Sequence, residues 1–149
     1  MPDPETIARA HRDARQGKSP STQAGEFVRE EMHHIREGKH GARSAKQAIA
    51  IGLSKARRAG IALPTPGRGK VSAASRRRIQ RDYQKGQHGG AQKPSRIRSR
   101  ATMRALKREG QQAASPAALS NHAHRAALKR SPSARSASAH RAAQTRQQM

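Results

Sequence analysis

Large apolar side chains are scarce in this chain and are gathered in one stretch. Val, Ile, Leu and Phe supply only 15 of the 149 residues, below the roughly 20% expected of a chain that folds throughout. Residues 21–63 nevertheless hold nine of the twenty apolar side chains larger than alanine. We therefore expect one small folded unit, and not a core that spans the whole length.

The apolar positions of this stretch recur with the period of two helices. The first is expected over about 22–37, where one face carries Ala24, Val28, Met32 and Ile35. The second is expected over about 45–59. Because a short loop joins them, the two helices are predicted to form an antiparallel hairpin. A short N-terminal helix is expected over residues 3–16, with Asp3 as its N-cap.

The second helix carries the clearest local signals. Ser44 and Gln47 form a capping box, in which each side chain satisfies a backbone N–H at the helix start. Gly60 suits a left-handed turn that folds Ile61 back onto the last helical turn. Small residues spaced four apart form a row against which another helix can pack closely, namely Ala48, Gly52 and Ala56.

The expected fold class is therefore all-α, in three segments. Residues 1–20 form the N-terminal helix and a linker, residues 21–64 form the hairpin, and residues 65–149 form a basic tail rich in Arg, Ala and Ser. The tail is expected to be largely disordered or partly helical. A hairpin of this size supplies little core, so marginal stability, a homodimer formed through the hairpin, and ordering on a partner all stay open.

Three parts of the tail have helical signals. Short basic helices are expected over 71–86 and 96–109, separated by a linker over 86–95. A sixteen-residue repeat follows, over 115–130 and 131–146, and its two copies match at ten positions. Each copy opens with Ser-Pro, a pair that suits the N-cap and first position of a helix. Two copies are too few for a self-stacking array, so they are expected to become helical on a polyanion.

Acidic and basic residues are segregated along the chain. Seven of the nine acids precede Gly38, and only Asp82 and Glu109 follow it. From residue 38 onward the chain carries 26 of its 32 Lys and Arg residues. An excess of this size cannot be neutralised within the chain, which favours an external polyanion such as nucleic acid.

The aromatic content indicates how nucleic acid would be bound. Phe27 and Tyr83 are the only aromatic residues besides histidine, whereas base-stacking platforms need several. Contacts to the phosphate backbone are therefore expected, which tolerate many sequences and depend on salt. The residues expected to make them are Lys46, Lys55, Arg57, Arg58, Arg76, Arg77, Arg78, Arg81, Arg96, Arg98, Arg100, Arg104, Lys107 and Arg108.

No pattern indicates catalysis, a cofactor or a metal. Glu30 and Glu31 are expected to face solvent or to pair with cations of the second helix. The eight histidines are scattered, and the adjacent His33 and His34 point about 100° apart on a helix. Pairs such as His33 with His40, or His122 with His124, are therefore expected to be solvated and not to hold a functional metal.

No segment indicates a membrane or an export signal. The longest apolar runs fall short of the ~18 residues that span a bilayer, the N-terminus has no apolar signal core, and cysteine is absent. A cytoplasmic protein located at the nucleoid is expected.

Three function hypotheses follow from these observations. The first is a non-enzymatic, histone-like protein that binds duplex DNA by neutralising phosphates. The second changes the target to structured RNA or the ribosome. The third is a hairpin that binds a protein partner, or protects under stress, with the tail only as a solubilising segment.

The stretch from residue 26 to 64 also resembles a known group of sequences. Its segments GEFVREEM, REGKHG and KQAIAIGLSKARRAG are similar to the signature of a family of small basic bacterial proteins of unknown function. The resemblance covers residues 17–64 and implies a bacterial source and the same helical hairpin. It implies no activity and no catalytic residues. The tail beyond Pro64 lies outside this signature and resembles the basic tails of linker-histone-like bacterial proteins.

Overall fold

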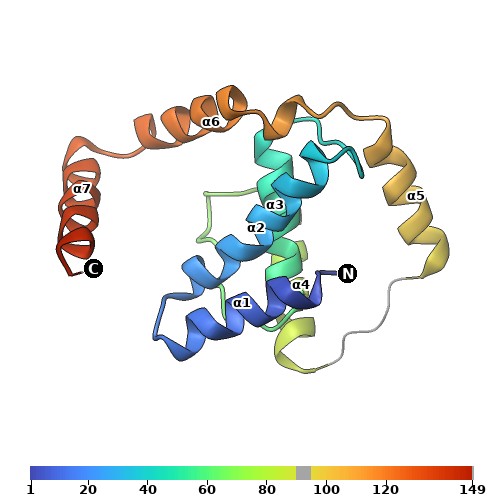
Figure 1. Ribbon diagram of the computed structural model, residues 1–149, viewed down its shortest axis with the longest axis horizontal. Coiled ribbons are helices and arrows are strands. Elements are labelled where there is room, and N and C mark those ends of the chain that lie inside the picture. The colour runs from blue at the N-terminus through green and yellow to red at the C-terminus, as the bar shows by residue number, and fades with distance from the viewer. Residues whose placement is uncertain (90–94, 149) are drawn as a thin grey trace.

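The computed structural model describes residues 1–89 and 95–148, and within these ranges the chain is helical with no strand (Figure 1). The helices in chain order are α1 (Pro4–Arg15), α2 (Pro20–Arg36), α3 (Ala45–Arg58), α4 (Ala73–Gln87), α5 (Arg96–Lys107), the 3₁₀ turn η1 (Gln112–Ala114), α6 (Pro116–Leu128) and α7 (Pro132–Gln147). The predicted all-α class is confirmed. Of the helices described, none combines the length and the apolar composition needed to cross a membrane.

The predicted antiparallel hairpin is formed by α2 and α3. α2 packs against both α1 and α3. The small-residue row of α3 lies against α2, and a Cβ placed on Gly52 would stand only 2.7 Å from the Cα of Val28. The helices therefore approach each other closely because position 52 carries no side chain.

Local capping explains where the two helices begin and end. α2 begins two residues earlier than predicted, because Pro20 takes its first position and Ser19 accepts from the backbone N–H of Thr22. At α3, Ser44 Oγ accepts from the Gln47 N–H at 3.2 Å as expected. The Gln47 side chain instead accepts from the N–H of Arg43, one residue before the predicted partner.

The end of α3 follows the predicted left-handed turn. Gly60 has a φ of +92°, and the N–H of Ile61 donates to the carbonyl of Ala56 at 3.1 Å. Ile61 is thereby buried against the open end of the hairpin. It joins an apolar cluster with Ala10 of α1 and Phe27 of α2, so the N-terminal helix and the residues after α3 close this end of the core.

The tail differs most from expectation, because it is mostly helical and not largely disordered. Each of α4 to α7 begins at a serine whose hydroxyl accepts from the N–H three residues later. Both Ser-Pro pairs of the repeat cap a helix, at Ser115 and Ser131, as predicted. The described part of the linker predicted over 86–95 is shorter than expected, because α4 continues to Gln87. Residues 90–94 of that linker lie outside the described residues.

The middle of the tail packs onto the loop of the hairpin. The N–H groups of Gly41 and Ala42 donate to the carbonyls of Leu106 and Gly110, at 2.9 and 3.1 Å. Ala113 and Ala114 are buried in a second apolar cluster, whose other buried members are Met32, Ile35, Ala42 and Ala48. The tail therefore completes the core at the loop end of the hairpin.

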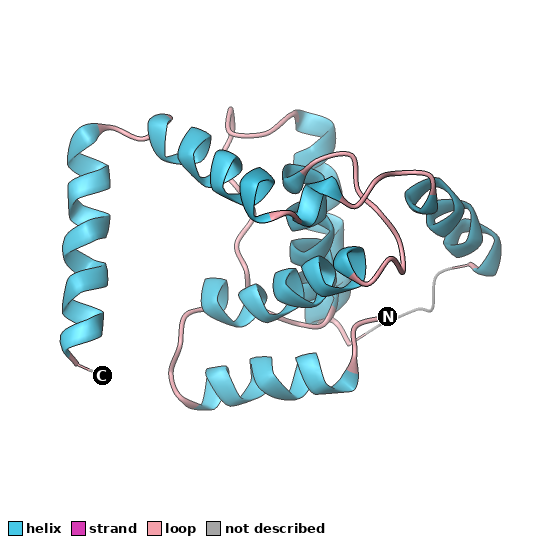
Figure 2. Cartoon of the chain, turned by 45° about the horizontal axis from the view of Figure 1, so that its top comes forward, coloured by secondary structure: helices cyan, strands magenta, loops and turns pink. Residues whose placement is uncertain are grey.

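Two helices stand apart from this body. Figures 1 and 2 show α5 on one side of the bundle and α7 on the other. α7 is joined to the bundle through α6, whereas α5 also touches it at the carbonyl of Leu106 in its last turn. Neither helix contains a buried residue. Their side chains are thus available to an external partner along their whole length.

Candidate functional site

The outward face of α4 is basic. Its inner face carries Ile79, Asp82 and Tyr83, which are buried or half-buried, and packs against α3. A 3.6-residue repeat places the cations of the other positions on the opposite side, and these are exposed: Arg77, Arg78, Arg81 and Lys85. Packing and charge together therefore fix which side of α4 meets solvent.

The first turn of α4 lies beside a basic hollow. Arg68, Arg76 and Arg77 line a hollow of about 340 Å³ next to Val71. Arg76 Nε also donates to the carbonyl of Pro66 at 3.2 Å, which fixes its stem. Three arginines among the lining residues are a composition that suits an anionic group such as a phosphate.

α5 is the most basic helix. Five of its twelve residues are Arg or Lys, and none is acidic. Four of the five recur on one side of the helix at helical spacing, namely Arg96, Arg100, Arg104 and Lys107. Arg98 lies on the opposite side, and Arg108 follows the last turn. All six are exposed, and within the described ranges no acidic side chain pairs with any of them. We call the four aligned residues the α5 stripe.

The four candidate residues of α3 have different surroundings. Lys46 is exposed. Arg57 is buried and donates to the carbonyls of Leu63 and Pro64. Burial lowers the pKa of Arg57 from its ordinary value, and the charge of Asp82 opposes this shift. Arg57 is therefore a structural residue that ties the end of α3 to the chain that follows.

The other two cations of α3 make internal ion pairs. Lys55 Nζ lies 2.7 Å from Glu31 Oε2, and Arg58 Nε lies 2.8 Å from Asp82 Oδ1. Arg58 keeps half of its side chain exposed, whereas Lys55 keeps a quarter. Of the four candidates, Lys46 is thus the one whose charge no described contact engages, and the tail helices supply most of the remaining accessible cations.

Two of the three acids of α2 form an unexpected buried cluster. Glu30 and Glu31 pair with Lys55 of α3, as one of the two sequence expectations had it, but neither faces solvent. Glu31 is fully buried and Glu30 is 4% exposed. Acids are almost never fully buried without partners, so sequence reasoning had no signal for this placement other than the lysine on the facing helix.

Two histidines join this cluster, which corrects the expectation of solvated rings. His40 is 6% exposed, and its Nε2 lies 3.2 Å from Glu31 Oε1. His34 is half-buried, with Nε2 3.4 Å from Asp3 Oδ2. The ring centroids of His34 and His40 lie 6.2 Å apart. The loop after α2 thus brings His40 back beside His34, whereas His33 is exposed.

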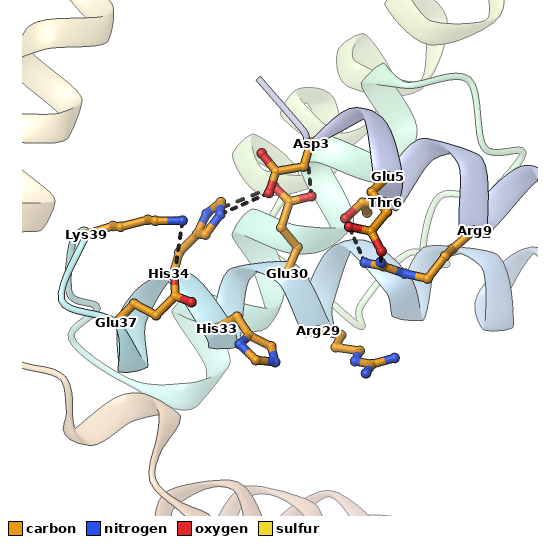
Figure 3. A pocket seen from close by; sticks show the side chains of 10 residues that line it. All are labelled: Asp3, Glu5, Thr6, Arg9, Arg29, Glu30, His33, His34, Glu37 and Lys39. Atoms are coloured by element: carbon orange, nitrogen blue, oxygen red, sulfur yellow. Dashed lines mark hydrogen bonds and ion pairs between the residues drawn. The ribbon is translucent and has the colours of Figure 1, made fainter.

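A pocket of about 220 Å³ opens beside the cluster, between α1 and α2 (Figure 3). Asp3, Glu30 and His34 converge on one wall, as the dashed contacts of Figure 3 show. Beside His34, a hydrogen bond from Lys39 lowers the pKa of the Glu37 carboxylate from its ordinary value. The pocket gives solvent a route to His34.

Comparison with known proteins finds a family match that covers the hairpin and ends before the tail helices. Residues 15–66 match the model of a family of unknown function, DUF6496. This range contains α2, α3 and the loop between them, while α4 to α7 lie outside it. The match agrees with the resemblance to an uncharacterised family and carries no activity. No curated protein and no solved structure matches the chain.

Proposed function

We propose that this protein binds nucleic acid, duplex DNA in preference to RNA, by sequence-tolerant contacts to phosphates, without catalysis and at the nucleoid. The observation that carries the proposal is the α5 stripe. α5 has five cations, no acid and no buried residue. The rest of the fold therefore neither neutralises its charge nor buries its side chains. The composition of α5 is explained by a polyanion outside the chain.

The dimensions of the α5 stripe suit a duplex. From Arg96 to Lys107 the helix rises roughly 16 Å, and the major groove of DNA, about 12 Å wide, admits an α-helix. Arginines along one side of such a helix can reach successive phosphates. Each guanidinium group can donate two parallel hydrogen bonds to the oxygens of one phosphate.

The outward face of α4 adds a second group of cations on a firmly packed helix. These cations take no part in the contacts between α4 and α3, so nucleic acid can be bound by this face without any change in the fold. The scarcity of aromatic residues excludes a stacking platform as the main mode. Affinity is therefore expected to be dominated by the release of counterions.

A salt titration tests the proposal. The full chain is titrated with a random-sequence DNA duplex at several salt concentrations, with double-stranded RNA of equal length as competitor. Contacts to about eight phosphates predict a slope of log K against log salt near −7, and DNA is expected to be retained against the RNA. A slope near zero would refute phosphate binding, and displacement by equimolar RNA would move the target to RNA.

A further inference from the structure

The buried polar cluster holds three side chains arranged as metal ligands. Glu31, His34 and His40 each offer one ligand atom, and these atoms lie within 4.8 Å of one another. Glu31 and His34 stand three residues apart on α2, a spacing that puts a carboxylate and an imidazole on the same side of a helix, as in known metal-binding bundles. His40 reaches the same point from the loop.

The hydrogen bonding of His40 gives the first argument for a cation. Its Nδ1 lies 3.0 Å from the carbonyl oxygen of Gly41. A carbonyl only accepts, so Nδ1 carries the proton, and in the neutral ring Nε2 presents a lone pair. That lone pair faces Glu31 Oε1 at 3.2 Å. Two acceptors at this distance repel each other unless a proton on Nε2 or a metal cation lies between them. A histidine that binds metal through one nitrogen usually donates from the other to a carbonyl in this way.

The buried carboxylates give the second argument. Glu31 Oε1 and Glu30 Oε1 are both buried, and neither accepts a hydrogen bond from any residue that the structure describes. Buried charged oxygens that accept no hydrogen bond are costly. Within the described residues, Lys55 is the only Lys or Arg within 4 Å of either carboxylate. Two carboxylates and one ammonium group therefore leave an excess of negative charge at buried oxygen atoms.

The same contacts assign a role to Lys55. It holds Oε2 of Glu31 at 2.7 Å, which leaves Oε1 turned toward His40. A carboxylate ligand is usually fixed by such a neighbour. His34, at the edge of the pocket of Figure 3, provides the route by which an ion can enter and the side from which water can complete its coordination.

We propose that Glu31, His34 and His40 bind one divalent transition-metal ion of the zinc class. Two imidazoles and one carboxylate are a ligand set that suits zinc and disfavours magnesium and calcium. Tetrahedral ligands of zinc lie roughly 3.4 Å apart, so the three side chains close inward on binding. The ion ties α2 to the loop at His40, next to Gly41 and Ala42 where the tail docks, so metal binding and tail docking reinforce each other.

The test uses the full chain after removal of metal with a chelator, titrated with Zn²⁺ alone by calorimetry. One tight site is expected. His34→Gln and His40→Gln should each weaken it more than tenfold, since each removes a ligand. The matched control is His33→Gln, which removes the exposed neighbouring ring and should change the affinity less than twofold. A His122→Gln, His124→Gln double variant should also keep the tight site.

Equal Zn²⁺ affinity in the wild type, His34→Gln and His40→Gln would overturn the proposal, as would the absence of a tight site. Circular dichroism without metal shows whether the variants are folded. If either is not, Co²⁺ bound to the wild type decides. Intense ligand-field bands of four-coordinate Co²⁺ support the site, and only weak octahedral bands refute it.

Discussion

Arg58 Nε donates to Asp82 Oδ1 at 2.8 Å, and the other carboxylate oxygen of Asp82 accepts from Ser54 Oγ at 2.7 Å. The single acid of α4 therefore holds this helix against α3. The only other acid after Gly38 is Glu109, which lies 3.8 Å from Arg43 where the tail meets the loop. The two acids left in the basic part of the chain thus stand at its two docking points.

Replacing Asp82 by Asn is expected to loosen α4. The substitution removes a buried charge that accepts two hydrogen bonds, and we expect it to lower the free energy of unfolding by about 1–3 kcal/mol. Urea denaturation measures this. The matched control is Glu5→Gln, which removes an exposed i,i+4 pair with Arg9 and should cost less than about 0.5 kcal/mol. Equal effects would mean that Asp82 is not an anchor.

Two helix-interior glycines should respond to alanine with opposite signs. Gly52→Ala places a methyl group 2.7 Å from the Cα of Val28, so α2 and α3 must separate, at a cost of about 1–3 kcal/mol. Gly25→Ala meets nothing within 4 Å and should stabilise α2 by about 0.5–1 kcal/mol through helix propensity alone. The difference in thermal midpoint between the variants checks both. Destabilisation of similar size at both positions would contradict the close packing.

A single added methyl group at Gly41 is expected to weaken the docking of the tail. A Cβ on Gly41 would stand 2.0 Å from the carbonyl oxygen of Glu109, so Gly41→Ala should release the segment from Leu106 to Ala114. Faster hydrogen exchange at Ala113 and Ala114, and faster tryptic cleavage after Lys107, are expected. Gly110→Ala, which meets nothing within 4 Å, is the control and should behave as wild type. Unchanged exchange in Gly41→Ala would show that the segment does not depend on this contact.

Truncation after Pro64 is expected to destabilise the hairpin as well as remove charge. It deletes Ala113, Ala114 and the partly buried Leu119 from the cluster at the loop end, and with them α4. Circular dichroism of residues 1–64 should therefore show a lower thermal midpoint than the full chain. An unchanged midpoint would mean that the hairpin folds independently of the tail.

The helix boundaries could be predicted to within two or three residues because they rest on local chemistry. Ser44, Ser115 and Ser131 are helix N-caps, as the residues after them indicate. Gly60 follows α3 in the left-handed conformation that a glycine at this position favours.

The docking of the tail could not be predicted, and the reason is compositional. Ala113 and Ala114 are buried, but in a tail rich in alanine no periodicity distinguishes them from their exposed neighbours. The cluster around Glu31 escaped prediction for another reason. It joins His40 in a loop to His34 in a helix, and only the fold of that loop brings the two rings together.

A pair of charge-matched variants tests whether the α5 stripe binds DNA phosphates. One replaces three arginines of the stripe by Gln, at Arg96, Arg100 and Arg104. The other replaces three exposed arginines of α1 and α2, at Arg12, Arg15 and Arg29. Because both lose the same net charge, a purely generic polycation would respond equally to either.

The measurement is the slope of log K against log salt for a random-sequence duplex. Loss of three phosphate contacts predicts that the slope of the α5 variant is shallower by about 2.7, while the slope of the α1 and α2 variant stays close to that of the wild type. Equal slopes in the two variants would show that the α5 stripe makes no phosphate contacts beyond those of any exposed arginine.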